Sequence, residues 1–138
     1  MGIDLSMSVL VVEDSRTMGQ IVRNLLLLLG FRHVDNVSDG PTALGKLREK
    51  PYGLVISDWN MQPMTGQALL KVVRADPILK GIPIIVVTAQ SQRATITAAK
   101  DAGASSYIVK PFSGEVLKQK IAAVLSSDKT AGYNIPLN

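Results

Sequence analysis

Short runs of apolar, largely β-branched residues constrain the fold of this chain more than any other feature. Clear runs occupy residues 9–12 (VLVV), 54–56 (LVI), 84–87 (IIVV) and 107–109 (YIV), and residues 34–37 (VDNV), where two polar residues separate the valines, are a weaker candidate strand. Uninterrupted apolar runs of this length are typical of strands that are covered on both faces of a parallel sheet. The sequence therefore predicts five such strands.

Segments with apolar residues at helical spacing alternate with these strands. We expect helices near residues 16–29, 41–50, 65–75, 90–102 and 116–125. The fourth is alanine-rich, with Ile96 as its one large apolar residue, so we expect it to be thinly anchored. Five strand–helix units without a repeat or linker predict an α/β fold, a doubly wound five-stranded parallel sheet flanked by five helices.

Composition excludes several other classes of protein. The 138 residues suit one domain, and the longest apolar run, residues 25–29, is far too short for a membrane span. The net charge of +4 comes from scattered basic residues, with few aromatic residues for base stacking. There is no cysteine. We expect a cytoplasmic protein that binds neither nucleic acid nor membrane.

Polar and charged residues follow four of the predicted strands. Glu13 and Asp14 follow the first strand, Asp58 the third, Thr88 the fourth and Lys110 the fifth. Because the carboxyl ends of parallel strands meet at one edge of the sheet, these side chains should converge. Clustered carboxylates repel one another unless they share a cation, and Mg²⁺ fits such a site. A carboxylate, a divalent metal and a lysine together indicate phosphoryl chemistry on the carboxylate.

The chain resembles response-regulator receiver domains, and in particular single-domain chemotaxis regulators of the CheY-like type. The resemblance rests on VVEDSRTMGQIVRNLL, VISDWNM, VVTAQ, AGAS and YIVKPF, which begin at residues 11, 55, 86, 102 and 107. It spans about residues 8–125. It implies a flavodoxin-like sheet of strand order 2-1-3-4-5, a receiver domain over residues 1–126 and a C-terminal tail at 127–138.

The resemblance also implies a phosphoacceptor and a metal site. Asp58 would accept the phosphoryl group and would bind Mg²⁺. Asp14 would bind the metal directly, Glu13 would act through a bound water, and the backbone carbonyl of Asn60 would complete the protein ligands. The residue after Met61 is glutamine where the family usually has proline, so the loop after Asp58 departs from the family pattern.

Further residues would act on the phosphoryl group and transmit its presence. By resemblance, Thr88 and Lys110 would contact the phosphoryl group, and Tyr107 would be an aromatic switch whose rotamer follows Thr88. This switch would couple Asp58 to the surface formed by the fourth helix, the fifth strand and the fifth helix, where family partners dock. Asn60 and Gln90 would tune dephosphorylation.

These features together predict a stand-alone two-component response regulator. It would take phosphate from a sensor histidine kinase, catalyse its own phosphorylation and dephosphorylation without being a conventional enzyme, and then change its binding to a protein such as a flagellar motor switch. No output domain is expected after Leu125, a phosphatase could act on the phosphorylated form, and a monomer is expected. We also expect Trp59 to be half-exposed and His33 to lie in a connector.

Four alternatives remain open at this point. A receiver could serve as a phosphate sink or relay, or it could bind partners independently of phosphorylation. A haloacid-dehalogenase-like phosphatase also uses an aspartate with Mg²⁺, but that family wants a second aspartate where this chain has Asn60. A flavodoxin-like cofactor binder would need a phosphate-cradling first loop, which Glu13 and Asp14 oppose by charge.

Overall fold

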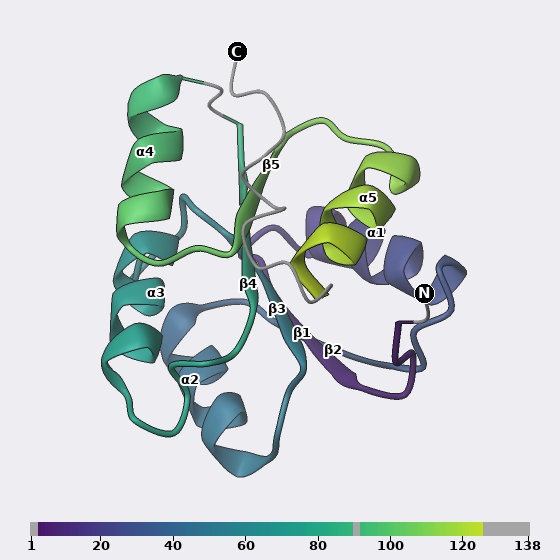
Figure 1. Ribbon diagram of the computed structural model, residues 1–138, viewed down its shortest axis with the longest axis horizontal. Coiled ribbons are helices and arrows are strands. Elements are labelled where there is room, and N and C mark those ends of the chain that lie inside the picture. The colour runs from purple at the N-terminus through teal and green to yellow at the C-terminus, as the bar shows by residue number, and fades with distance from the viewer. Residues whose placement is uncertain (1–2, 90–91, 126–138) are drawn as a thin grey trace.

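The computed structural model describes residues 3–89 and 92–125 and contains one five-stranded sheet (Figure 1). All neighbouring strands are parallel, and their order is β2-β1-β3-β4-β5, as predicted. The strands are β1 (Ser8–Val12), β2 (His33–Val37), β3 (Leu54–Asp58), β4 (Ile84–Thr88) and β5 (Ser106–Val109). His33 was expected in a connector, and that prediction is wrong because it is the first residue of β2, although its side chain is exposed.

In the part of the chain that the structure describes, five helices connect or follow the strands. They are α1 (Arg16–Leu28), α2 (Gly40–Glu49), α3 (Gly66–Ala75), α4 (Arg93–Asp101) and α5 (Gly114–Leu125). Side chains cap the first three, since Ser15, Asp39 and Thr65 each accept a hydrogen bond from the backbone N–H three residues on. Gln90 and the predicted tail at 127–138 lie outside the described residues.

The helices cover the two faces of the sheet in separate layers. Figure 1 shows α1 and α5 on one face and α2, α3 and α4 on the other. Alternate residues of β1 enter the two layers: Leu10 and Val12 pack with α2 and α3, while Val9 and Val11 pack with α1 and α5. Burial on both faces explains the uninterrupted apolar runs of β1, β3 and β4, whereas β2, with the sequence HVDNV, is largely half-buried or exposed.

Helix α4 is held more weakly than α1, as its composition predicts. Its buried residues are Ile96 and Ala99, and among the described residues, which exclude 90 and 91, no side-chain hydrogen bond caps its N-terminus at Gln92. A helix that buries so little apolar surface gains little stability from packing.

Arg74 ties α3 to two loops at the amino-terminal end of the sheet. Its Nη1 donates to the carbonyls of Lys80 at 2.8 Å and Ile82 at 2.7 Å, and its Nε donates to the carbonyl of Gly103 at 2.8 Å. One guanidinium therefore satisfies three carbonyl groups of irregular backbone.

Within the part of the chain that the structure describes, no helix is both long enough and apolar enough to cross a lipid bilayer.

Candidate functional site

Five of the residues selected from the sequence lie at the carboxyl end of a strand or within two residues after it: Glu13, Asp14, Asp58, Thr88 and Lys110. Asp58 is the last residue of β3 and Thr88 the last residue of β4. Glu13 follows β1, where its N–H donates to the carbonyl of Val37, and the N–H of Lys110 donates to the carbonyl of Thr88 at 2.8 Å. The parallel sheet thus brings these residues to one edge, as predicted.

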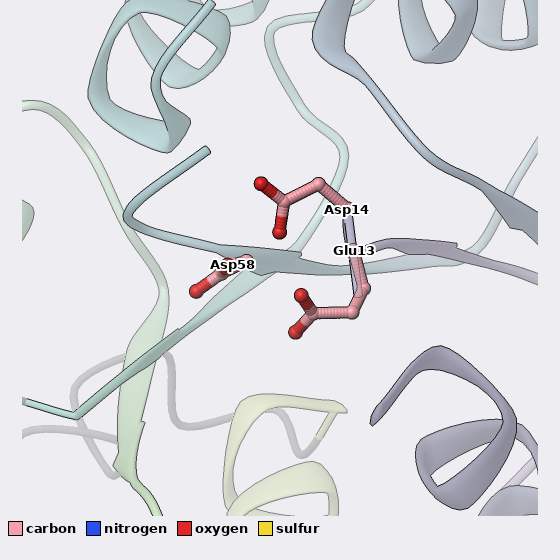
Figure 2. Close-up of side chains that lie close together, drawn as sticks. All are labelled: Glu13, Asp14 and Asp58. Atoms are coloured by element: carbon pink, nitrogen blue, oxygen red, sulfur yellow. The ribbon is translucent and has the colours of Figure 1, made fainter. Parts of the chain in front are cut away.

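Three carboxylates meet at this edge. One oxygen each of Glu13, Asp14 and Asp58 lies within 4.8 Å of the others. Figure 2 shows the side chains gathered around one space, with Asp14 extending from the loop after β1 and Asp58 from the end of β3. Glu13 and Asp58 are buried, whereas Asp14 is exposed. Three hard oxygen donors this close together can hold a divalent cation such as Mg²⁺, so the donor set fits the predicted metal.

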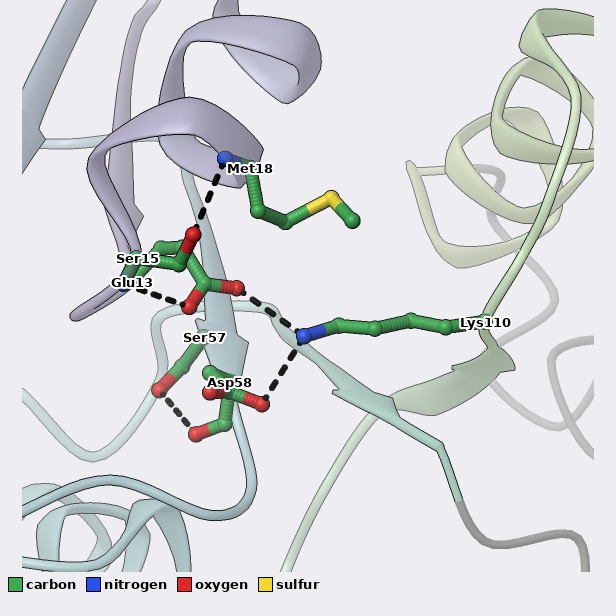
Figure 3. A network of polar contacts seen from close by, with 6 residues as sticks. All are labelled: Glu13, Ser15, Met18, Ser57, Asp58 and Lys110. Atoms are coloured by element: carbon green, nitrogen blue, oxygen red, sulfur yellow. Dashed lines mark hydrogen bonds and ion pairs between the residues drawn. The ribbon is translucent and has the colours of Figure 1, made fainter.

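Lys110 reaches two of the three carboxylates. Its Nζ lies 3.1 Å from Glu13 Oε1 and 3.5 Å from Asp58 Oδ1, as Figure 3 shows. The Glu13 side chain is 5% exposed and that of Lys110 is 20% exposed. The ammonium therefore offsets part of the negative charge of two buried carboxylates, those of Glu13 and Asp58.

Glu13 carries a second set of interactions that orient its carboxylate. Its Oε2 accepts a hydrogen bond from the Ser15 N–H at 3.0 Å, while its Oε1 faces Lys110. Burial, and to a lesser degree the Asp58 carboxylate, raise the pKa of Glu13, against the opposing effects of the Ser15 N–H and Lys110. The acid therefore releases its proton less readily than an exposed glutamate.

The backbone after Asp58 is packed tightly against the start of α3. The Gly66 N–H donates to the Trp59 carbonyl at 2.9 Å, and a Cβ at position 66 would overlap the Asp58 carbonyl oxygen. Only glycine allows this approach. Asn60 is exposed, and Trp59 is 8% exposed and packs in the core, so the expectation of a half-exposed tryptophan is wrong.

Thr88 and Tyr107 occupy neighbouring strands beside this edge. Both are buried, and Tyr107 pairs in register with Val86, two residues before Thr88. The ring of Tyr107 lies under the ammonium of Lys120 from α5, at 4.2 Å from the ring centroid. Lys120 was not selected from the sequence, because its contact with this ring depends on how α5 packs against β5.

Comparisons with known proteins identify the family to which the chain is similar. Residues 9–122 match the family model of the response regulator receiver domain. Chemotaxis protein CheY of Pseudomonas aeruginosa is 45% identical over 118 residues, which cover 86% of this chain and 95% of that protein. CheY4 of Vibrio cholerae superposes with a TM-score of 0.81 at 34% identity, covering 87% of this chain and 99% of that one.

A third comparison bears on the carboxylate cluster. The receiver domain of a sensor histidine kinase from Pseudomonas aeruginosa has a TM-score of 0.78 at 26% identity, covering 85% of this chain and 95% of that one. That structure has a magnesium ion coordinated in its active-site cleft.

The chain belongs to the response-regulator receiver family, and within it the chain is similar to CheY-type chemotaxis proteins. Receiver domains are signalling switches rather than classical enzymes, and they bind Mg²⁺ at an acidic pocket of the kind formed here. They interact with histidine kinases and with downstream targets.

Proposed function

We propose that this protein is a stand-alone response regulator of chemotaxis or motility signalling that accepts a phosphoryl group on Asp58. A sensor histidine kinase donates the group, and the phosphorylated protein changes its affinity for a protein partner, such as a flagellar motor switch. The receiver domain extends over residues 1–126, with residues 127–138 as a tail. The similarity to CheY proteins supports the assignment to chemotaxis.

The observation that carries the proposal is the geometry around Asp58. Its carboxylate is buried at a strand end, in a cluster with Glu13 and Asp14, and a lysine ammonium lies 3.5 Å away. A carboxylate that serves only as a helix cap or surface group needs neither the acids nor the lysine. A carboxylate that attacks phosphorus needs both: the neighbouring acids bind a cation, and the lysine balances the charge of the incoming phosphoryl group.

In the proposed reaction, an oxygen of Asp58 forms a bond to the phosphorus of the donor phosphohistidine. The bond from phosphorus to the imidazole nitrogen breaks, and its electron pair remains on that nitrogen, which takes up a proton. Lys110, already beside Asp58, pairs with the phosphoryl oxygens, and the Thr88 hydroxyl donates a hydrogen bond to them. Transfer of the group to water later restores the carboxylate, and Asn60 and Gln90 tune that rate.

Asp14, Asp58 and the carbonyl of Asn60 would hold Mg²⁺, with Glu13 acting through a water. When bound, the ion supplies positive charge that stabilises the charge developing on the transferred oxygens. The protein contributes the positions of these oxygens: Glu13 is fixed by Ser15 and Lys110, and Asp58 by its strand.

Phosphorylation would be transmitted through Thr88 and Tyr107. Both are buried on adjacent strands, so a movement of the Thr88 hydroxyl toward the phosphoryl group frees space into which the Tyr107 ring can adjust. The partner would bind the surface formed by α4, β5 and α5. The weak anchoring of α4 supports this choice, because a thinly held helix adjusts at low cost.

Intact-mass measurement tests the proposal. Wild-type protein and the Asp58→Asn variant are incubated with acetyl phosphate in the presence of Mg²⁺ or a chelator. We expect one phosphoryl adduct on the wild-type protein, dependent on Mg²⁺, and none on the variant. An equal adduct on Asp58→Asn would refute the assignment of the acceptor. A wild-type protein that remains unmodified would favour phosphorylation-independent binding.

A further inference from the structure

Lys120 is a charged residue in a position that normally holds an apolar one. It lies on α5 between Leu117 and Ile121, both of which pack in the core, and the residue is only 7% exposed. Lysine is almost never buried to this degree without a compensating interaction. A buried ammonium in this position therefore calls for a physical explanation.

The compensating interaction is the ring of Tyr107. Lys120 Nζ lies 4.2 Å from the ring centroid, well within the range of a cation–π contact. Tyr107 is also only 7% exposed. Within residues 3–89 and 92–125, Lys120 forms no ion pair with a carboxylate. Burial lowers the pKa of Lys120, in keeping with an ammonium that has lost most of its water.

The Lys120 ammonium and the Tyr107 ring stabilise each other in their buried positions. A cation–π contact is stronger when water is excluded, and here both the cation and the ring are buried. If the ring moved away, the ammonium would lose its π face while still confined among the apolar side chains of α5. The charge on Lys120 therefore favours the buried position of the ring over any exposed one.

We propose that Lys120 is a positioning residue that holds the Tyr107 ring in its buried position through the charge of its ammonium. It thereby sets the ratio of buried to exposed ring positions before any phosphoryl group arrives. The consequence for signalling rests on the proposed function, in which the position of this ring reports on Asp58. The contact itself, and its effect on the ring, does not depend on phosphorylation.

The position of the ring can be followed by NMR of protein labelled at the tyrosine ring ε carbons. The chain has three tyrosines, so the Tyr107 signal is assigned from its absence in Tyr107→Leu. A neutral paramagnetic chelate in solution broadens exposed rings and not buried ones. The variants are Lys120→Met, which keeps the shape and removes the charge, and Lys120→Arg, which keeps a cation. Lys118→Met, at an exposed position of the same helix, is the matched control.

We expect Lys120→Met to shift the ratio of buried to exposed ring positions toward the exposed one by about two- to thirty-fold. Lys120→Arg and Lys118→Met should stay near the wild-type ratio. A Tyr107 signal unchanged in Lys120→Met overturns the inference. An equal change in Lys120→Met and Lys120→Arg also overturns it, because shape rather than charge would then hold the ring.

A second measurement needs no variant at position 120. The ring current of Tyr107 should move the Lys120 ε-proton resonances upfield in the wild-type protein, and Tyr107→Leu should remove that shift. Absence of the shift in wild type overturns the inference even if Lys120→Met does not fold. Both readouts use unphosphorylated protein, whereas failure of the proposed function would appear separately, as a wild-type protein that gains no phosphoryl adduct by mass.

Discussion

Replacing Lys110 with methionine should destabilise the metal-free protein by about 3 kcal/mol, because it leaves a buried carboxylate without its cation. Lys110 Nζ lies 3.1 Å from Glu13 Oε1, and the Glu13 side chain is 5% exposed. At an effective dielectric constant of about 20, two unit charges at this distance attract by about 5 kcal/mol. The expected loss of free energy is smaller than this, because Lys110 is partly exposed and Glu13 keeps its hydrogen bond from Ser15. It should lie near the lower end of the free energies measured when one partner of a buried ion pair is removed.

Urea unfolding followed by circular dichroism, at neutral pH with a chelator, measures this loss. The double variant Glu13→Gln, Lys110→Met should be more stable than Lys110→Met alone, because a neutral amide is not left as an unpaired charge. Lys71→Met, at an exposed lysine on α3, controls for the loss of a lysine as such. The reasoning is refuted if Lys110→Met unfolds at the wild-type urea concentration, or if the double variant is no more stable than Lys110→Met.

Three further predictions concern stability. The pKa of Glu13 is raised in the folded protein, so the folded protein binds the proton of this carboxyl more tightly than the unfolded chain does. The contribution of Glu13 to stability is therefore present at low pH and is lost as pH rises above the ordinary pKa of 4.5. Urea titrations from acid to neutral pH should show this loss in the wild-type protein and not in Glu13→Gln. Arg74→Met should lower the free energy of unfolding by about 2 to 4 kcal/mol in the same assay, because three carbonyls lose a charged donor. Arg74→Lys should restore less than half of this free energy. Wild-type stability in Arg74→Met would contradict the prediction. Gly66→Ala should lower the free energy of unfolding by at least about 2 kcal/mol, because its Cβ would overlap the Asp58 carbonyl. Gly45 has open space around it, so Gly45→Ala should raise the free energy of unfolding by about 0.5 to 1 kcal/mol. Equal thermal midpoints for the two variants would show the packing argument to be wrong.

The strands and the convergence of the site followed from properties that are local in sequence. A run such as residues 84–87 can only be a doubly covered strand or part of a buried helix, and its length favours the strand. Once the strands are parallel, the residues that follow them must meet at one edge. The cluster of Glu13, Asp14 and Asp58 was predictable for this reason, before any distance was known.

Properties that depend on packing between distant segments were not predictable in this way. Trp59 follows a strand and was expected to be half-exposed, but it is buried in the core that α3 and β3 share with neighbouring elements. Lys120 was not singled out, because lysine on an amphipathic helix is usually solvated, and its burial depends on a ring contributed by β5. The sheet predicts that Lys110 and Glu13 converge, but the 3.1 Å contact between Lys110 Nζ and Glu13 Oε1 depends on how side chains 97 positions apart pack.

The position of β3 in the sheet determines how a change at Asp58 can spread. Strand β3 is the middle strand and is hydrogen-bonded on both sides, to β1 and to β4, whereas β5 pairs with β4 alone within the described residues. The carboxylate is thus carried by a strand that is restrained on both sides, whereas β5 is an edge strand and the neighbouring α4 buries only Ile96 and Ala99. If Asp58 is phosphorylated as proposed, we therefore expect the backbone of β3 to stay in place and any displacement to appear at β5 and α4.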